Sequence, residues 1–156
     1  MKAIRIHEHG GLNVLKWDEI SEPTPSPNQV LVNVQYTSLN HLDIWVRKGI
    51  PGVPLPIITG SDAAGVISSV GENVDRNRIG EKVMIQPLIY CDDCPSCQSG
   101  KENLCYKMGI RGENCQGINA EKIVVKDSTA IPFPNHLSSY EAAAFSLVAQ
   151  TSYQMI

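Results

Sequence analysis

Four of the five cysteines in this chain lie between positions 91 and 105, with the spacing C-x2-C-x2-C-x7-C. They are Cys91, Cys94, Cys97 and Cys105. Two residues between neighbouring ligands let consecutive thiolates gather on one face of a turn, and Gly100 lets the chain bring the fourth thiolate back to close a tetrahedron. Four thiolates leave no open coordination position. The spacing therefore predicts one structural zinc ion, which we expect to govern the local order of this lobe.

Three other uses of the cysteines fit the sequence less well. Paired disulfides need an oxidising compartment, and we see no secretory signal. A ferredoxin-type cluster needs a fourth cysteine after three residues and then a proline, whereas Cys105 follows after seven and precedes Tyr106. A nucleic-acid-binding zinc module carries basic residues among its ligands, and this segment has three acidic residues against Lys101. The fifth cysteine, Cys115, is expected to be a buried or half-buried thiol.

Short strands are the main elements that must hold this lobe. Alternating apolar residues between turn residues predict strands at 2–7, 14–20, 30–36, 60–70, 82–86, 121–125 and 129–132. The strongest of these patterns, at 30–36, places Val30, Val32, Val34 and Tyr36 on one face. Many short strands predict a mainly β fold, a partly open barrel or sandwich.

Two helices are predicted among the strands. Asn40 is a competent N-cap for a short helix that ends at Lys48, ahead of Gly49. Ser138 and Glu141 have the spacing of a capping box in front of a second helix at 142–149. The second helix marks a boundary. We expect one domain over residues 1–137, which includes the lobe at 91–105, and a junction to further structure over 138–156.

The composition restricts the class of function. The chain has 156 residues and a formal net charge of −3, and its basic residues are dispersed along the sequence. This pattern argues against a nucleic acid or a membrane surface as a partner. The first residues lack the apolar core of a signal peptide, and the longest apolar run, 142–149, is too short to span a bilayer. We therefore expect a cytoplasmic protein.

Taken together, these residues resemble the medium-chain dehydrogenase/reductase family of zinc alcohol dehydrogenases and related quinone reductases. The resemblance rests on GKENLC at 100–105, GSDAAGV at 60–66, GEKV at 80–83 and NAE at 119–121. It covers essentially the whole chain and implies a GroES-like catalytic domain, a partly open β-barrel with a structural zinc lobe. Family members continue into a Rossmann domain that binds NAD(H) or NADP(H). No Gly-x-Gly-x-x-Gly follows a strand here, so we expect a portion that is truncated before that domain and inactive alone.

The family's catalytic zinc is bound by a cysteine, a histidine and a further cysteine or carboxylate. Carried over position by position, the resemblance places Asn40, Ser61 and, more loosely, Leu147 where those ligands stand. Leu42 stands where the proton-relay hydroxyl belongs. The four functional groups are missing together. The pattern is instead similar to the zinc-independent reductases of the family, and implies NAD(P)H-dependent reduction of a quinone, an enone or a related carbonyl compound.

Four polar residues are the candidate catalytic residues. Asn40 and Ser61 are expected to donate hydrogen bonds to the oxyanion that grows during hydride transfer. Asp43 and Asp62 occupy positions that hold carboxylates around the metal ligands in the family. We expect these two carboxylates to fix the geometry of the loops.

The resemblance also implies contacts with the cofactor. It places His41 beside the pyrophosphate, and Thr151 and Tyr153 beside the nicotinamide. Two other functions stay open: a zinc-dependent alcohol dehydrogenase that binds its metal through Asp43, Asp62 or His41, and a stand-alone, non-enzymatic zinc-binding domain. The substrate and the choice between NADH and NADPH are not determined by these residues. A homo-oligomer is expected for the full-length protein.

Overall fold

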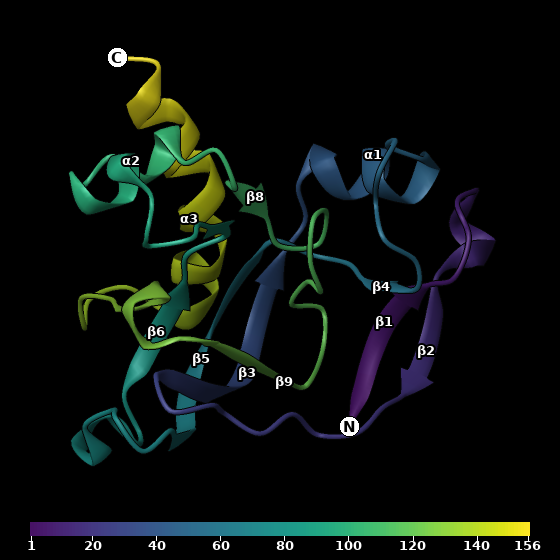
Figure 1. Ribbon diagram of the computed structural model, residues 1–156. Coiled ribbons are helices and arrows are strands. Elements are labelled where there is room, and N and C mark those ends of the chain that lie inside the picture. The colour runs from purple at the N-terminus through teal and green to yellow at the C-terminus, as the bar shows by residue number, and fades with distance from the viewer.

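Ten strands and three α-helices make up the structure, a computed structural model that describes all of residues 1–156 (Figure 1). The strands are β1 Lys2–Ile6, β2 Lys16–Glu19, β3 Gln29–Ser38, β4 Ile57–Ile58, β5 Asp62–Val70, β6 Lys82–Ile85, β7 Leu88–Ile89, β8 Gly109–Ile110, β9 Lys122–Lys126 and β10 Ala130–Pro132. The helices are α1 His41–Lys48, α2 Pro95–Gln98 and α3 Ser139–Gln154. Short 3₁₀ turns lie at Leu12–Val14, Arg76–Arg78, Glu102–Leu104 and Asp127–Thr129.

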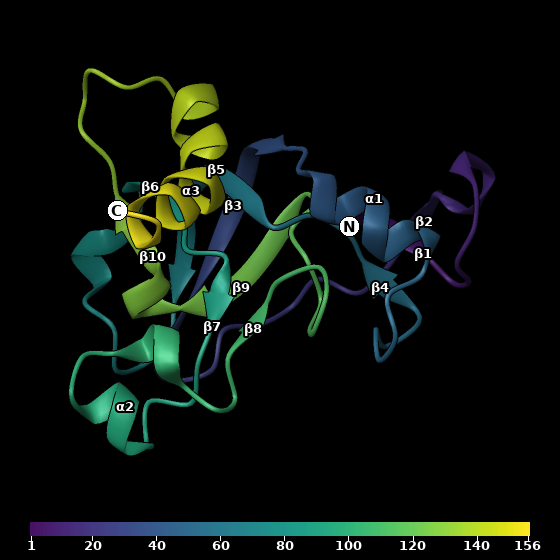
Figure 2. The ribbon, with the colours of Figure 1, turned by 90° about the horizontal axis from the view of Figure 1, so that it is seen from above.

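A curled five-stranded antiparallel sheet, in the order β10-β6-β5-β3-β9, is the centre of the fold. A three-stranded sheet, β2-β1-β4, lies beside it, and β7 pairs with β8. The lobe that carries α2 projects at one end of the molecule, and the three-stranded sheet with α1 lies at the other (Figures 1 and 2). The prediction of a mainly β, partly open barrel is confirmed.

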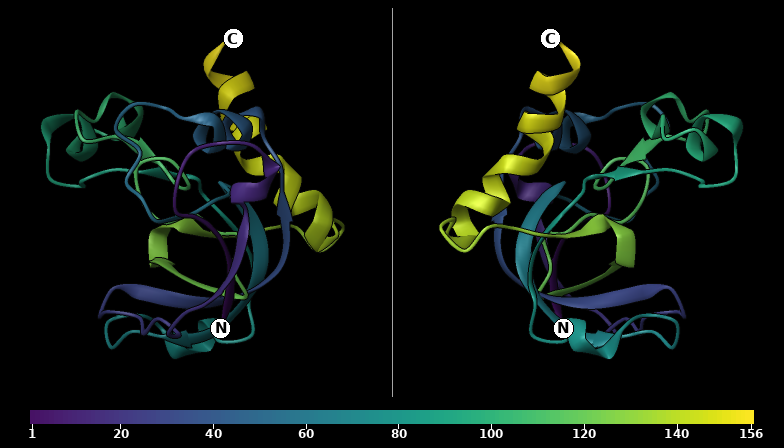
Figure 3. Two further views of the ribbon diagram at one scale, coloured as in Figure 1. Left: turned by 90° about the vertical axis from the view of Figure 1, so that its right-hand side faces the viewer. Right: turned by 90° about the vertical axis from the view of Figure 1, so that its left-hand side faces the viewer.

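The core lies between the curled sheet and the segments that cover it. Its fully buried side chains are mostly branched and aliphatic, as pleated strands favour: Val30, Val32, Ile67, Val83, Ile85, Ile118 and Val125. Helix α3 runs across the outside of the sheet (Figure 3). Its small residues Ala142 and Ala143 pack against Ala64 of β5 and Phe133. Small side chains at this contact let the helix approach the sheet closely, which brings the middle of α3 near the start of β5.

The predicted elements agree with the structure except at their edges. The capping box is confirmed, because Ser138 donates to the Glu141 carboxylate and Glu141 N–H donates back to Ser138 Oγ. The helix it starts runs on to Gln154, beyond the predicted end at 149. No helix is both long and apolar enough to cross a membrane.

The predicted face of β3 is wrong at Tyr36. Val30 and Val32 are fully buried, but the register of β3 against β5 shifts between Val34 and Tyr36. Such a bulge turns the following side chains relative to the regular alternation. Tyr36 is 50% exposed and lies edge-on to Tyr140 of α3, with ring centroids 6.1 Å apart.

Candidate functional site

The four lobe cysteines converge on one point. Their sulfur atoms all lie within 4.8 Å of one another. Cys94 Sγ is 3.4 Å from Cys97 Sγ, and Cys91 Sγ is 3.5 Å from Cys105 Sγ and 4.0 Å from Cys97 Sγ. A tetrahedral zinc ion with bonds of about 2.3 Å would hold sulfurs about 3.8 Å apart. The four predicted ligands therefore form one cluster, a possible metal site whose geometry fits a tetrahedral ion.

Main-chain groups donate hydrogen bonds to two of these sulfurs. Cys97 N–H donates to Cys94 Sγ at 3.5 Å, where the chain enters α2 with Pro95 at its first turn. Lys107 N–H donates to Cys105 Sγ at 3.3 Å. The hydrogen bond from Cys97 N–H lowers the pKa of the Cys94 thiol to about 7. The thiolate is the form that binds metal, so the donor at Cys94 favours ligation there. A hydrogen bond with Asp93 raises the pKa of the Cys91 thiol, and burial raises that of Cys97.

A lysine of the central sheet ties the lobe to the barrel. Lys126, at the end of β9, donates to the carbonyl of Tyr90 at 3.0 Å and pairs with the carboxylate of Asp92. Its Nζ also lies 5.2 Å from the centroid of the Tyr90 ring. The lobe is thus oriented by the sheet as well as by its own sulfurs. No pattern in the sequence predicts this contact, because 34 residues separate Lys126 from Asp92.

A second polar centre forms around Asp62, the first residue of β5. Its side chain is fully buried and accepts hydrogen bonds from the Ser38 hydroxyl at 3.1 Å, from Asn40 Nδ2 at 2.9 Å and from the Leu147 main-chain N–H at 2.9 Å. Burial raises the pKa of Asp62, and the three donors oppose that shift. One carboxylate therefore joins the end of β3, the start of β5 and the middle of α3.

The structure brings together the three positions that the family resemblance singled out. Asn40 and Leu147 both donate to the Asp62 carboxylate, and Ser61 precedes Asp62 in the chain. The positions are far apart in sequence, and the close packing of α3 on β5 is what gathers them. Asn40 and Leu147 therefore donate to the same acceptor, the carboxylate of Asp62.

Ser61 is buried next to this centre and bonds to the loop that carries Arg111. It is 1% exposed, and its hydroxyl donates to the carbonyl of Arg111 at 2.8 Å. The loop that carries Arg111 packs directly on Gly60, which has φ +93°. A side chain at Gly112 would place its Cβ 2.6 Å from the Gly60 carbonyl oxygen. Glycine is therefore required where the two backbones meet, and this contact fixes the position of Ser61.

An apolar cleft of about 570 Å³ opens next to Asn40. Its polar lining includes Asn40, Asp43 and Asn119. Its apolar walls come from β1, from the loop after β1, from the β3–α1 connection and from α1: Ile4, Leu12, Leu15, Leu39 and Ile44. A mostly apolar cleft with a few convergent polar groups is the usual form of a small-molecule site. Asn119 is held in place by its hydrogen bond to Thr59 Oγ1, at 3.0 Å.

The predicted cofactor contacts lie on α1 and α3. His41 begins α1, lines the cleft and stacks at a tilt on Trp45, with ring centroids 4.8 Å apart. Thr151 is exposed on α3, and its hydroxyl donates to the Leu147 carbonyl at 2.9 Å. Tyr153 is 78% exposed near the end of the same helix. Both α3 residues therefore present surface that is open to a ligand or to further structure.

The Asp43 side chain stabilises the start of α1, and its titration makes the free energy of unfolding depend on pH. Its carboxylate accepts the Asn40 main-chain N–H at 2.7 Å, which completes the predicted capping role of this segment. Burial raises the pKa of Asp43 above 3.8, hydrogen bonds from the main chain at Asn40 and Gly60 oppose that shift, and the nearby Asp62 charge adds to it.

Wild-type protein is therefore expected to gain stability over Asp43→Asn as the pH falls through this raised pKa towards 3.8. In that window the folded protein binds a proton that the unfolded chain does not yet hold. Below 3.8 the difference should level off, because both states are protonated. Urea unfolding of the two proteins at matched pH values checks the prediction, and subtracting the two curves removes the carboxylates that do not interact with Asp43. A relative loss of wild-type stability on acidification would contradict it.

Residues 26–135 match the family model described as the alcohol dehydrogenase GroES-like domain. The chain belongs to this family. Over 157 aligned residues it is 28% identical to an alcohol dehydrogenase of Schizosaccharomyces pombe, covering 99% of this chain and 45% of that protein. It is 28% identical to an L-threonine 3-dehydrogenase of Rhizobium etli, covering 82% and 38% of the two chains.

Among solved structures, the chain superimposes on an NAD-dependent alcohol dehydrogenase with a TM-score of 0.95 and 39% identity. The match covers 100% of this chain and 46% of that one. The chain therefore spans less than half the length of these relatives, and it has the fold of their N-terminal GroES-like portion. The family resemblance inferred from the sequence motifs is confirmed.

Proposed function

We propose that this chain is the catalytic-domain portion of an NAD(P)H-dependent oxidoreductase that reduces quinones, enones or related carbonyl compounds without a catalytic zinc ion. The observation that carries the proposal is the centre at Asp62. Asn40, Ser61 and Leu147, at the positions of the family's metal ligands, offer an amide, an internally bonded hydroxyl and an aliphatic side chain. Only the lobe cysteines gather three or more His, Cys, Asp or Glu ligand atoms at metal-binding distances.

The proposed role of Asn40 follows from its hydrogen bonds with Asp62 and Asp43. Its Nδ2 donates one hydrogen to Asp62, and its main-chain N–H is held by Asp43. An amide nitrogen has two hydrogens, so the second one is left for a ligand in the cleft that Asn40 lines. A donor fixed on both sides is suited to stabilise a developing oxyanion. Ser61 can add a second donor only by turning its hydroxyl away from the Arg111 carbonyl.

Bound NAD(P)H would supply the hydride. This chain contains no glycine-rich phosphate-binding turn, so its part in binding the cofactor is confined to residues such as His41 and Thr151. Both are exposed, at the start of α1 and on α3. The apolar walls of the cleft would exclude water from the reacting groups and accept the ring or chain of an apolar substrate. The small-molecule partner is therefore expected to present an oxygen to Asn40 and an apolar body to Leu12 and Ile44.

We also propose that the lobe holds one structural zinc ion per chain. Four thiolates satisfy tetrahedral zinc completely, so the ion has no place for a substrate. Its chemistry is confined to stabilising residues 91–105. The reaction is assigned to the other centre, at Asn40 and the cleft.

A zinc-dependent alcohol dehydrogenase is the alternative, and the names of the relatives favour it. Its metal would need ligands from Asp43, Asp62 or His41. The Asp62 carboxylate already accepts three hydrogen bonds from within the chain, and Asp43 accepts the Asn40 N–H. Recruiting either carboxylate would break these contacts, so we rank this alternative second.

Metal content and turnover of the full-length protein separate the two functions. The proposal predicts about one zinc per chain, reduction of a quinone or enone with NADH or NADPH, and no loss of the initial rate during brief exposure to a chelator that leaves the lobe zinc bound. Asn40→Ala should lower the turnover number at least tenfold, in line with the loss of one oxyanion donor. Two zinc ions per chain, with alcohol oxidation that stops when one is removed, would refute the proposal.

A further inference from the structure

Arg111 is a largely buried cation without a partner. No carboxylate lies within ion-pair distance of its guanidinium, and its buried Nε has no hydrogen-bond acceptor. Burial lowers the pKa of Arg111, since the charge has lost its water without gaining an anion. Arginine nonetheless stays protonated in proteins. The guanidinium therefore carries a positive charge without an ion-pair partner, and its Nε is shielded from water.

The other arginines show how this chain usually satisfies such a group. Arg5 pairs with Asp18 at 3.2 Å. Arg78 pairs with Glu81 and Asp127 and donates to the Ala130 carbonyl at 2.7 Å. Arg47 donates to the Gly10 carbonyl, and Arg76 is exposed. Arg5 Nε is likewise buried without an acceptor, but Arg5 still has its ion pair with Asp18. Arg111 combines a buried, unpartnered Nε with the absence of any ion pair.

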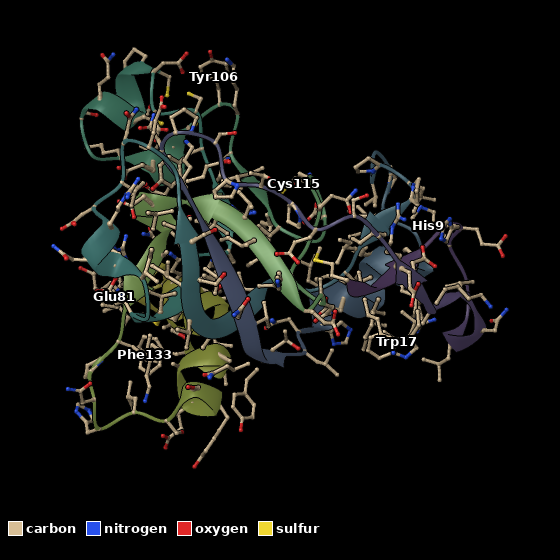
Figure 4. The ribbon with its side chains drawn as sticks, turned by 90° about the horizontal axis from the view of Figure 1, so that it is seen from below. His9, Trp17, Glu81, Tyr106, Cys115 and Phe133 are labelled. Atoms are coloured by element: carbon tan, nitrogen blue, oxygen red, sulfur yellow. The ribbon has the colours of Figure 1, made fainter.

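The side chain of Arg111 lines a pocket of about 410 Å³ between the three-stranded sheet and β9. Most of the surrounding wall is apolar, with Ile20, Pro23, Ile58 and Val124 among its residues. Figure 4 shows Cys115, another lining residue, between the five-stranded sheet and the part of the chain that carries His9 and Trp17. The pocket thus has an apolar body and a buried cation.

The remaining polar groups of the pocket do not neutralise Arg111. Lys122 is also a cation, and it is already paired with Glu22, at 2.6 Å. Cys115 lies opposite Arg111 in a parallel bridge, and burial raises the pKa of its thiol, so the thiol stays uncharged at neutral pH. Gln116 uses its side chain to bind the main chain at Pro56 and Ile58. None of these groups supplies an anionic partner for Arg111.

We propose that this pocket binds a small aliphatic carboxylate, with its anionic end on the Arg111 guanidinium and its apolar chain against Ile58 and Val124. A guanidinium presents two parallel N–H groups that match a carboxylate, and pairing restores the interaction that burial has removed. The apolar walls favour a ligand with a hydrocarbon body over a bare inorganic anion.

The pocket is separate from the cleft at Asn40. Ile58 lines the pocket, and the next residue, Thr59, lines the cleft. Neighbouring residues of a strand point to opposite faces, so the chain at β4 divides the two spaces. The main chain at Arg111 contacts the residue before Asp62, because its carbonyl accepts the Ser61 hydroxyl.

Hexanoate is a suitable probe, with hexan-1-ol as its uncharged counterpart and inorganic phosphate as a bare anion. Calorimetry with the full-length protein should give a Kd of about 1 mM or tighter for hexanoate. Cys115 provides a second readout, since alkylation by N-ethylmaleimide can be followed at this cysteine alone by peptide mass spectrometry. Hexanoate at ten times its Kd should slow that alkylation about tenfold. Hexan-1-ol and phosphate should bind at least tenfold more weakly.

Arg111→Gln should abolish hexanoate binding and the protection of Cys115, whereas Arg76→Gln, at an exposed arginine, should retain both. Equal protection in Arg111→Gln, or no protection of the wild-type protein at 10 mM hexanoate, overturns the proposal. Equal binding of phosphate and hexanoate overturns the aliphatic part of it. If Arg111→Gln fails to fold, the comparison of hexanoate with hexan-1-ol in wild-type protein decides the case alone.

Discussion

Cys94→Ser is expected to release the lobe metal and to lower the free energy of unfolding by about 3 kcal/mol, or roughly 10 °C in Tm for a chain of this size. Metal binding in small four-ligand zinc peptides provides about 10–16 kcal/mol. The smaller figure applies here because the core of the curled sheet is independent of the lobe, and the lobe is also held by Lys126. The loss should therefore be local.

Cys115→Ser is the matched control, because it removes a thiol from the same chain but not from the cluster. Its metal content should equal that of wild-type protein. Elemental analysis of the purified proteins, thermal unfolding and hydrogen exchange should agree, with faster exchange in Cys94→Ser confined to residues 88–110. Full metal content in Cys94→Ser, or lost metal in Cys115→Ser, would refute the four-cysteine assignment.

The lobe could be predicted from the sequence because its information is local. Four ligands within one short segment limit the folded shape before any tertiary contact forms, and the resulting cluster has the expected members. The same holds for the capping box at Ser138 and Glu141, whose donors and acceptors are three residues apart. Spacing along the chain is a reliable guide where all partners share one turn.

The sequence predicts the centre at Asp62 only in part. The family motifs indicated Asn40, Ser61 and Leu147 one by one, but the sequence did not show that Asp62 joins two of them or that Ser38 contributes a third donor. Leu147 donates through its main chain, so its side-chain type carried no information about this role. The face of Tyr36 was also missed, because a bulge depends on how two strands pair and not on the pattern within either one.

Arg111 illustrates a different limit of the sequence. A lone arginine in a polar loop normally faces solvent, and nothing in its neighbours predicts burial. Its environment is built by segments distant in sequence, the end of the first hairpin, β4 and β9. Only the fold shows that these segments surround a cation without supplying an anion.

Asp62→Ala is expected to lower the free energy of unfolding by about 3 kcal/mol, since each of three hydrogen bonds contributes about 1 kcal/mol. Two effects oppose each other at this site. Removing the charge relieves the desolvation that raises the pKa of Asp62. The Ser38 hydroxyl, the Asn40 amide and the Leu147 N–H then lose their acceptor inside the protein, and leaving buried donors unpaired is the larger cost.

Asp75→Ala is the matched control, because the Asp75 carboxylate accepts only the Asn77 N–H, at the surface, and its loss should cost about 1 kcal/mol or less. Urea unfolding measures both losses. Hydrogen exchange at Leu147 gives a local readout, and it should accelerate in Asp62→Ala alone. If Asp62→Ala were as stable as Asp75→Ala, Asp62 would not join α3 to the β3–α1 connection. Asn40 would then lack the fixed orientation that the proposed reduction requires, so this variant tests the active-site assignment through stability alone.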